Sequence, residues 1–151
     1  MAEPFSFIGE FAHSLDDKAR LALPGKLREE LQKSARPDEV TASANKEGYV
    51  ALYPYEQWLK IEEKLSEIPD TRTRMITTRG LVGKAKRVPV DKLGRLVIPQ
   101  ELREMAGLSR EVTVLGGIYK IEIWDRARLQ IQMAEEEALV LETLNSMEVP
   151  L

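Results

Sequence analysis

Apolar and polar positions along the chain predict the same order of strands and helices twice. In the first half they predict strands over 5–12, 20–23, 38–44 and 49–53 and helices over 24–34, 54–68 and 71–80. In the second half they predict strands over 84–90, 95–98, 111–115 and 118–124 and helices over 99–107 and 125–146. Each half is thus strand, turn, strand, helix, hairpin and helix, which indicates an α+β fold with a mainly β core and flanking helices.

The order repeats because part of the sequence repeats. Residues 16–29 and 91–104 are identical at 7 of 14 positions, and both begin with Asp-x-x-x-Arg and continue into an apolar strand, a proline and Leu-Arg-Glu. A repeat of this kind indicates two structural units of one type. We expect units over 1–80 and 81–151 that pack into one compact domain, because a core of about 70 residues is marginal on its own.

Each Asp-x-x-x-Arg segment predicts a tight turn that places a carboxylate beside a guanidinium. Such a pair holds the arginine in one rotamer and leaves part of its donor fork available for a phosphate or a guanine edge. The alternative for either copy is an ordinary surface ion pair that closes a β-turn. Two copies before the same strand and helix favour a binding role, although part of the repeat can serve folding alone.

The charge distribution favours an anionic partner more than the net charge of −3 does. Residues 72–95 contain eight basic side chains and one acidic side chain, a net charge of +7, whereas residues 125–151 have a net charge of −4. A solvated helix face and a lysine-protected edge strand are the alternative for the basic run. Because the run leads directly into the second turn, we interpret it as an electrostatic footprint for phosphates.

Catalytic and metal chemistry have little support in the sequence. There is no cysteine, His13 is the single histidine, and no glycine-rich phosphate loop has the required spacing. The acidic run at 135–137 points in different directions on a helix and does not form a metal site. We therefore expect no enzyme, no catalytic residue, no metal and no cofactor. The absence of cysteine, of a secretory signal and of a membrane-spanning run predicts the cytoplasm.

The two turns, together with segments Tyr49–Pro54, Leu102–Leu108 and Ile121–Asp125, resemble the MraZ family over nearly the whole chain. The resemblance implies two tandem AbrB-like swapped-hairpin units related by pseudo-two-fold symmetry. It also implies a homo-oligomeric ring, an octamer, that binds tandem repeats in double-stranded promoter DNA upstream of its own gene. By the same resemblance, that gene would head a bacterial cell-division and cell-wall cluster, which the protein would repress from the nucleoid.

The candidate DNA-binding residues are Asp16, Lys18, Arg20, Asp91, Lys92 and Arg95. The family motif maps onto all of these except Lys92, which lies beside the lysine position of the second turn. The resemblance implies that the lysines and arginines contact phosphates, that an arginine reads guanine and that the aspartates position the arginines. Two positions depart from the motif. Ala19 replaces a glycine, so the first turn either relaxes or has a negative φ. Leu93 occupies the lysine position of the second turn, beside Lys92.

A different class of function competes with this interpretation. An oligomeric scaffold could use the same repeated basic loops to bind an acidic protein, and loss of affinity with salt would fit both functions. Sequence-selective competition by DNA separates them. The operator sequence, the direction of regulation and the turn that meets DNA are not specified by the residues.

Overall fold

The computed structural model describes residues 5–150, and its elements follow the repeated order. The first half contains β1 (Glu10–Ser14), β2 (Arg20–Ala22), α1 (Gly25–Leu31), β3 (Glu39–Ala44), β4 (Tyr49–Tyr53), α2 (Tyr55–Ser66) and α3 (Thr71–Val82). The second half contains β5 (Lys86–Pro89), β6 (Arg95–Val97), α4 (Gln100–Ala106), β7 (Glu111–Gly116), β8 (Ile121–Asp125) and α5 (Arg126–Ser146). The α+β class predicted from the sequence is confirmed.

Strands from both halves build a six-stranded antiparallel sheet in the order β1-β7-β8-β4-β3-β5. The first strand of each half pairs with the hairpin of the other half, because β1 lies beside β7 and β5 lies beside β3. The order is palindromic about the β8–β4 contact. Strand β5, which carries Pro89, forms one edge of the sheet, a position that tolerates a proline.

A separate two-stranded ribbon joins the two repeats. Strands β2 and β6 pair antiparallel, with Leu21 opposite Leu96, its equivalent 75 residues later. Backbone hydrogen bonds extend the ribbon at both ends, and each joins residues of different halves. The Leu23 amide donates to the Gly94 carbonyl (2.9 Å), and the amide of Ile98 donates to the carbonyl of Ala19 (3.0 Å). These bonds are equivalent under the 75-residue repeat, which gives the ribbon a local two-fold arrangement.

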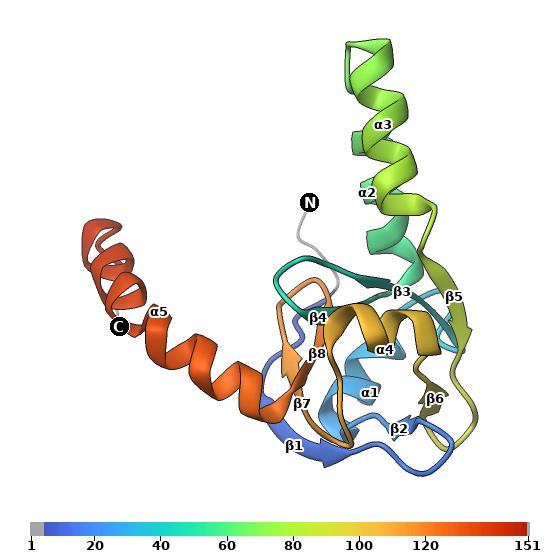
Figure 1. The fold of residues 1–151 in the computed structure, drawn as a ribbon, viewed down its shortest axis with the longest axis vertical. Helices are drawn as coiled ribbons and strands as arrows, with labels where there is room; N and C mark the ends of the chain where they lie inside the picture. The colour runs from blue at the N-terminus through green and yellow to red at the C-terminus, as the bar shows by residue number, and fades with distance from the viewer. Residues whose placement is uncertain (1–4, 151) are drawn as a thin grey trace.

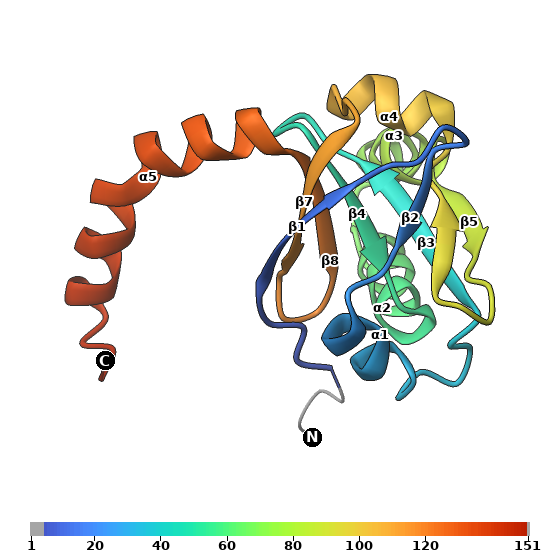
Figure 2. The ribbon, with the colours of Figure 1, turned by 90° about the horizontal axis from the view of Figure 1, so that it is seen from below.

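The main core lies beneath the ribbon and the six-stranded sheet. Leu21 and Leu96 are buried there together with Leu27 of α1 and Leu102 of α4. Both short helices begin directly after a proline, which supplies a fixed φ and no unpaired amide at the helix start. Figure 2 shows α1 and α4 at opposite ends of the body, as the repeat requires.

Two helical arms project from this body (Figure 1). One arm is the α2–α3 hairpin, in which the Asp70 carboxylate accepts a hydrogen bond from the Thr73 amide (2.8 Å) and caps α3. The other arm is α5, whose one buried residue, Leu129, packs with Tyr49 and Trp124. Within residues 5–150 no helix is both long and apolar enough to cross a bilayer.

Two predicted strand boundaries are wrong for a shared reason. The first strand was predicted over 5–12, but β1 begins at Glu10, and Phe7 instead bonds the backbone of Ile118 (2.9 and 3.0 Å). Gly116 was predicted as a turn residue but ends β7, where an added Cβ would lie 2.5 Å from backbone atoms of Phe7 and Ile8. The glycine therefore admits the crossing N-terminal segment, and β8 begins only at Ile121.

Candidate nucleic-acid interface

The first Asp-x-x-x-Arg segment, residues 16–20 (loop 1), is organised by its aspartate. The Oδ1 atom of Asp16 accepts hydrogen bonds from the amides of Lys18 and Arg20, both at 2.9 Å. The Oδ2 atom accepts from Nε of Arg20 at 2.6 Å. One carboxylate therefore closes the turn and fixes the arginine at the same time, so the folding role and the positioning role belong to the same side chain.

The second segment, residues 91–95 (loop 2), repeats this bonding atom for atom. The Oδ1 atom of Asp91 accepts from the amides of Leu93 (2.9 Å) and Arg95 (2.8 Å), and Oδ2 accepts from Nε of Arg95 (2.9 Å). Replacement of the lysine by Leu93 leaves the turn unchanged because the position contributes its amide. In both loops the arginine donates to the aspartate side chain through Nε.

Hydrogen bonding lowers the pKa of both aspartates. For Asp16 the backbone amide of Arg20 is the largest cause and its side chain the second. For Asp91 the backbone amide of Arg95 is again the largest cause, opposed by a smaller effect of burial. Both carboxylates are ionised at neutral pH, and the lowered pKa keeps them ionised and paired with the arginines further into the acid range than an ordinary aspartate.

Ala19 adopts the left-handed backbone that its glycine counterpart adopts. Its φ is +59°, against +77° for Gly94. The proposed negative φ at Ala19 is wrong, and the turn does not relax. The turn geometry is held by the Asp16 bonds and by the ribbon hydrogen bond to Ile98, which together outweigh the cost of about 1–2 kcal/mol for a non-glycine residue in this region.

Both arginines lie on the outward face of the ribbon. Side chains alternate along each strand, so the residues beside the buried Leu21 and Leu96 point away from the core. Arg20 lies opposite Val97, and Arg95 lies opposite Ala22. The two guanidinium groups therefore lie diagonally across from each other on one face of the ribbon. The sequence did not specify this shared face, and it left open which turn would meet a partner.

An open depression of about 390 Å³ brings these arginines together with a third. We call it the arginine groove and define it by Arg20, Arg87 and Arg95, with Asp91 also in its wall. Arg87 comes from β5, which is hydrogen-bonded to β3 and leads directly into loop 2. The sequence placed Arg87 in the basic run but did not select it. The feature that could have identified Arg87 as a site residue was its position four residues before Asp91, on the edge strand.

The other predicted contacts lie outside the groove wall. Lys18 and Lys92 are exposed at the tips of their loops. Next to Lys18, the Asp17 carboxylate would repel a phosphate. An ion pair with Arg110 at 3.3 Å offsets this negative charge. Arg110 was not predicted, because it follows α4 and reaches loop 1 only in the folded chain.

The basic run from 72 to 95 does not form one patch. Its first arginines lie on α3, which projects away from the ribbon (Figure 1). Lys84 and Lys86 approach Glu101 at 4.0 and 3.7 Å. Of the basic side chains in the run, Arg87 and Arg95 line the arginine groove. The predicted footprint is therefore divided between a projecting helix and the ribbon.

The two loops are supported differently from outside. An Nη2 atom of Arg28 donates to the carbonyl of Lys92, and the Arg28 side chain covers Gly94, so it braces loop 2. The repeat equivalent of Arg28 is Arg103, whose Nε donates to the carbonyl of Ile98 at 3.0 Å instead. Loop 1 thus lacks the arginine contact that braces loop 2. Because both repeats have an arginine at this position, the sequence did not predict the difference.

Across residues 5–150, no three carboxylate or imidazole side chains gather into a group that could hold a metal ion.

The chain matches one family model, described as "MraZ protein, putative antitoxin-like", over residues 6–78 and again over 81–146. The two matches correspond to the two halves of the sequence repeat.

Proteins named Transcriptional regulator MraZ are similar over most of the chain. The relative from Heliobacterium modesticaldum is 37% identical over 123 residues, covering 81% of this chain and 82% of its own. The relative from Caldicellulosiruptor saccharolyticus is 36% identical over 142 residues, covering 93% and 96%. The relative from Pediococcus pentosaceus is 35% identical over 132 residues, covering 87% and 89%. The chain therefore belongs to the MraZ family, whose curated relatives are named as transcriptional regulators rather than as enzymes.

Proposed function

We propose that this chain regulates transcription by binding a specific DNA sequence through the outward face of the β2–β6 ribbon. The observation that carries the proposal is the convergence of Arg20, Arg87 and Arg95 on one groove beside that ribbon. The major groove of B-DNA is about 12 Å wide and admits a two-stranded β-ribbon. Arginine is also the side chain best shaped for the acceptor pair of a guanine edge.

In this proposal the residues have distinct roles. Arg20 and Arg95 read guanine edges with their terminal nitrogens, because Asp16 and Asp91 already hold each Nε atom. Lys18 and Lys92, at the loop tips, contact phosphates on either side of the ribbon, and Arg87 adds a third guanidinium to the groove. The aspartates fix the arginines before DNA arrives, which reduces the entropy lost on binding.

The finer parts of the proposal follow from the family resemblance. Residues 1–80 and 81–151 form two AbrB-like swapped-hairpin units of one compact domain. Copies of the chain assemble into a ring, an octamer, whose arginine grooves meet successive promoter repeats. Linked contacts multiply affinity when the spacing of subunits matches the spacing of repeats. The protein then represses its own division and cell-wall gene cluster, acting in the cytoplasm at the nucleoid and without a cofactor.

A scaffold function is the second candidate, and one observation favours it. Leu93 and Val97 expose large apolar side chains beside the groove arginines, with 65% and 48% of each residue accessible. An acidic protein segment with apolar side chains would use both features. Such a partner would compete with any DNA sequence equally, whereas a regulator distinguishes its operator from scrambled DNA.

The test is fluorescence anisotropy on labelled duplex from upstream of the gene that encodes this chain, with unlabelled operator or scrambled duplex as competitor. Wild type, Arg20→Ala, Arg95→Ala and the double variant are compared at several salt concentrations. Selective binding by wild type, weakened by each substitution and lost in the double variant, supports the proposal. Equal competition by scrambled duplex refutes it and favours the scaffold.

A further inference from the structure

Two apolar side chains share the outward face of the ribbon with the arginines. Val97 lies opposite Arg20, and Ala22 lies opposite Arg95. Both apolar residues are exposed, Val97 with 48% of its surface accessible, whereas the leucines between these positions are buried. Each arginine therefore has an apolar side chain as its direct neighbour across the ribbon. The proposed DNA-contacting face is thus half apolar, which recognition of guanine by the arginines alone does not explain.

Val97 is also part of the arginine groove. It lines the groove together with Arg20, Arg87 and Arg95, whereas Ala22 is not among the lining residues. On neighbouring antiparallel strands, directly opposite Cβ atoms are about 4.5–5.5 Å apart. The Val97 methyl groups therefore stand beside the Arg20 side chain, and a ligand that covers more than the guanidinium contacts both.

The major groove of DNA offers one apolar group that fits this position. A guanine edge presents the N7 and O6 acceptors that an arginine contacts, and a thymine presents its C5-methyl group. Successive bases are about 3.4 Å apart along a strand, so an arginine on one base places its cross-strand neighbour over the next base pair. We infer that Val97 contacts the methyl group of a thymine adjacent to the guanine that Arg20 reads. The inference rests on the proposed function and adds a second base to what the ribbon recognises.

The difference between Val97 and Ala22 also orients the ribbon on its site. These two residues are equivalent in the repeat, as are the two arginines, and the ribbon has a local two-fold arrangement. The two arginines alone would therefore fit DNA equally well in two opposite orientations. Valine carries two methyl groups that alanine lacks, so the Val97 half of the ribbon favours a thymine more strongly. A thymine on one side of the guanine pair then fixes the direction of binding.

A role in strand formation is the alternative for Val97. Valine is β-branched and favours strands, so an exposed valine can serve the stability of a short ribbon alone. The two roles differ in what they predict for DNA. A structural valine changes the affinity for every duplex equally, whereas a valine that reads a methyl group changes the affinity only for a duplex that carries the methyl.

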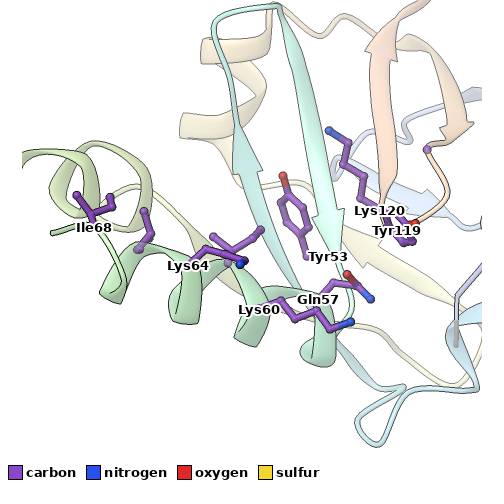
Figure 3. Close-up of a pocket in the computed structure, with 10 residues that line it drawn as sticks. Tyr53, Gln57, Lys60, Lys64, Ile68, Tyr119 and Lys120 are labelled. Carbon is purple, nitrogen blue, oxygen red and sulfur yellow. The ribbon is translucent and has the colours of Figure 1, made fainter. Parts of the chain in front are cut away.

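A larger apolar hollow lies apart from the ribbon. It has a volume of about 520 Å³ and runs along α2 to the β7–β8 turn (Figure 3). Two of its lysines are paired with neighbouring carboxylates, Lys64 with Glu67 (3.4 Å) and Lys120 with Glu122 (3.5 Å). The hollow shares no residue with the arginine groove. Apolar surface that is accessible elsewhere on the chain is therefore separate from the surface that Val97 supplies.

The test removes the thymine methyl groups and leaves the rest of the operator unchanged. Deoxyuridine lacks the C5-methyl group but keeps the O4 acceptor that thymine presents in the major groove. Fluorescence anisotropy measures affinity for a single-repeat duplex from upstream of the gene, first with thymine and then with deoxyuridine at each thymine position in turn. Val97→Ala is the test variant, and circular dichroism confirms that it is folded.

The matched control is the same substitution at another exposed valine. Val140 is 51% exposed on α5, which projects from the body away from the ribbon (Figure 1). Val140→Ala therefore removes as much apolar side chain as Val97→Ala does, at a site remote from the arginine groove.

We expect wild type to bind the deoxyuridine duplex about 4-fold more weakly at one position beside a guanine, the effect of one buried methyl group. Val97→Ala should bind the thymine duplex about as weakly as wild type binds the deoxyuridine duplex, and it should not distinguish the two. Val140→Ala should keep the wild-type ratio of the two affinities. The salt dependence should be the same for all three proteins, because an apolar contact neutralises no phosphate.

The failure of this inference can be told apart from the failure of the proposed function. If wild type prefers the operator to scrambled duplex but binds the thymine and deoxyuridine duplexes equally, the inference is overturned and the proposed function stands. Equal weakening of both duplexes by Val97→Ala also overturns the inference and leaves Val97 a structural role. If wild type shows no preference for the operator over scrambled duplex, the proposed function fails and the inference fails with it.

Discussion

Exchanging glycine and alanine between the two loops tests whether both turns need a left-handed backbone conformation at this position. The substitutions are Gly94→Ala in loop 2 and Ala19→Gly in loop 1, at equivalent positions of the repeat. Both residues have a positive φ, +77° and +59°. The surroundings differ, because an added Cβ at Gly94 would lie 2.6 Å from Cδ of Arg28.

The expected magnitudes follow from opposing contributions. Gly94→Ala costs about 1–2 kcal/mol for a side chain in the left-handed region, offset by about 0.4–1 kcal/mol from the less flexible unfolded chain. The clash displaces Arg28 and weakens its bond to the Lys92 carbonyl, which costs a further ~0.5–1.5 kcal/mol. We expect a net loss of roughly 0.5–3 kcal/mol in the free energy of unfolding.

Ala19→Gly should be nearly neutral. Relief of about 1–2 kcal/mol of backbone strain is offset by the flexibility of glycine and by loss of a buried methyl group, about 0.8 kcal/mol, because Ala19 is only 7% exposed. Urea denaturation at one fixed protein concentration measures both variants. A Gly94→Ala variant as stable as wild type would show that the turn geometry, or the brace by Arg28, is misassigned.

Three further predictions concern the loops and α5. Hydrogen bonds hold the pKa of Asp16 and Asp91 below the ordinary 3.8. The two ionised carboxylates therefore stabilise the folded state fully above that pH, and this stabilisation is lost as pH falls through the lowered pKa values. The double Asp→Asn variant should therefore lose less stability than wild type in acid unfolding between pH 5 and 2, and an unchanged profile would contradict this. Arg28→Ala should weaken operator binding in anisotropy more than its repeat equivalent Arg103→Ala, because only Arg28 braces loop 2, and equal losses would refute the asymmetry. Leu129→Ala should cost about 2–4 kcal/mol in urea denaturation by removing the buried anchor of α5, and a loss below about 1 kcal/mol would show that α5 is not anchored there.

Local chemistry made the repeated elements predictable. An aspartate four residues before an arginine specifies the turn, and a proline before Leu-Arg-Glu specifies the start of α1 and α4, so these elements lie within one residue of their predicted starts. The pairing of β2 with β6 joins residues 75 positions apart. The shared face of Arg20 and Arg95 depends on that pairing, and no local pattern encodes it.

Other misses also arise from contacts between distant segments. Gly116 has the sequence of a turn residue, but its function is to admit the backbone of Phe7. The apolar period of α5 correctly predicted a helix with one apolar face, but periodicity cannot say whether the same chain or another one covers that face. Arg28 and Arg103 are identical in the repeat and differ only in which carbonyl the folded chain brings within reach.

The salt dependence of operator binding tests the arginine groove most directly. On a duplex with one repeat, each phosphate neutralised contributes about −0.9 to the slope of log K against log salt, whereas loss of a base contact lowers affinity without that change. Arg20→Ala, Arg95→Ala and Arg87→Ala are compared with Arg72→Ala on the projecting α3 arm.

The account predicts lower affinity for all three groove variants and wild-type behaviour for Arg72→Ala. It predicts a slope reduced by up to about 0.9 for Arg87→Ala and an unchanged slope for Arg20→Ala and Arg95→Ala, because these two arginines contact bases. It also predicts that Arg20→Ala and Arg95→Ala reduce the difference in affinity between operator duplex and scrambled duplex. Wild-type binding by the three groove variants, with loss in Arg72→Ala, would contradict the account and place the DNA contact on α3.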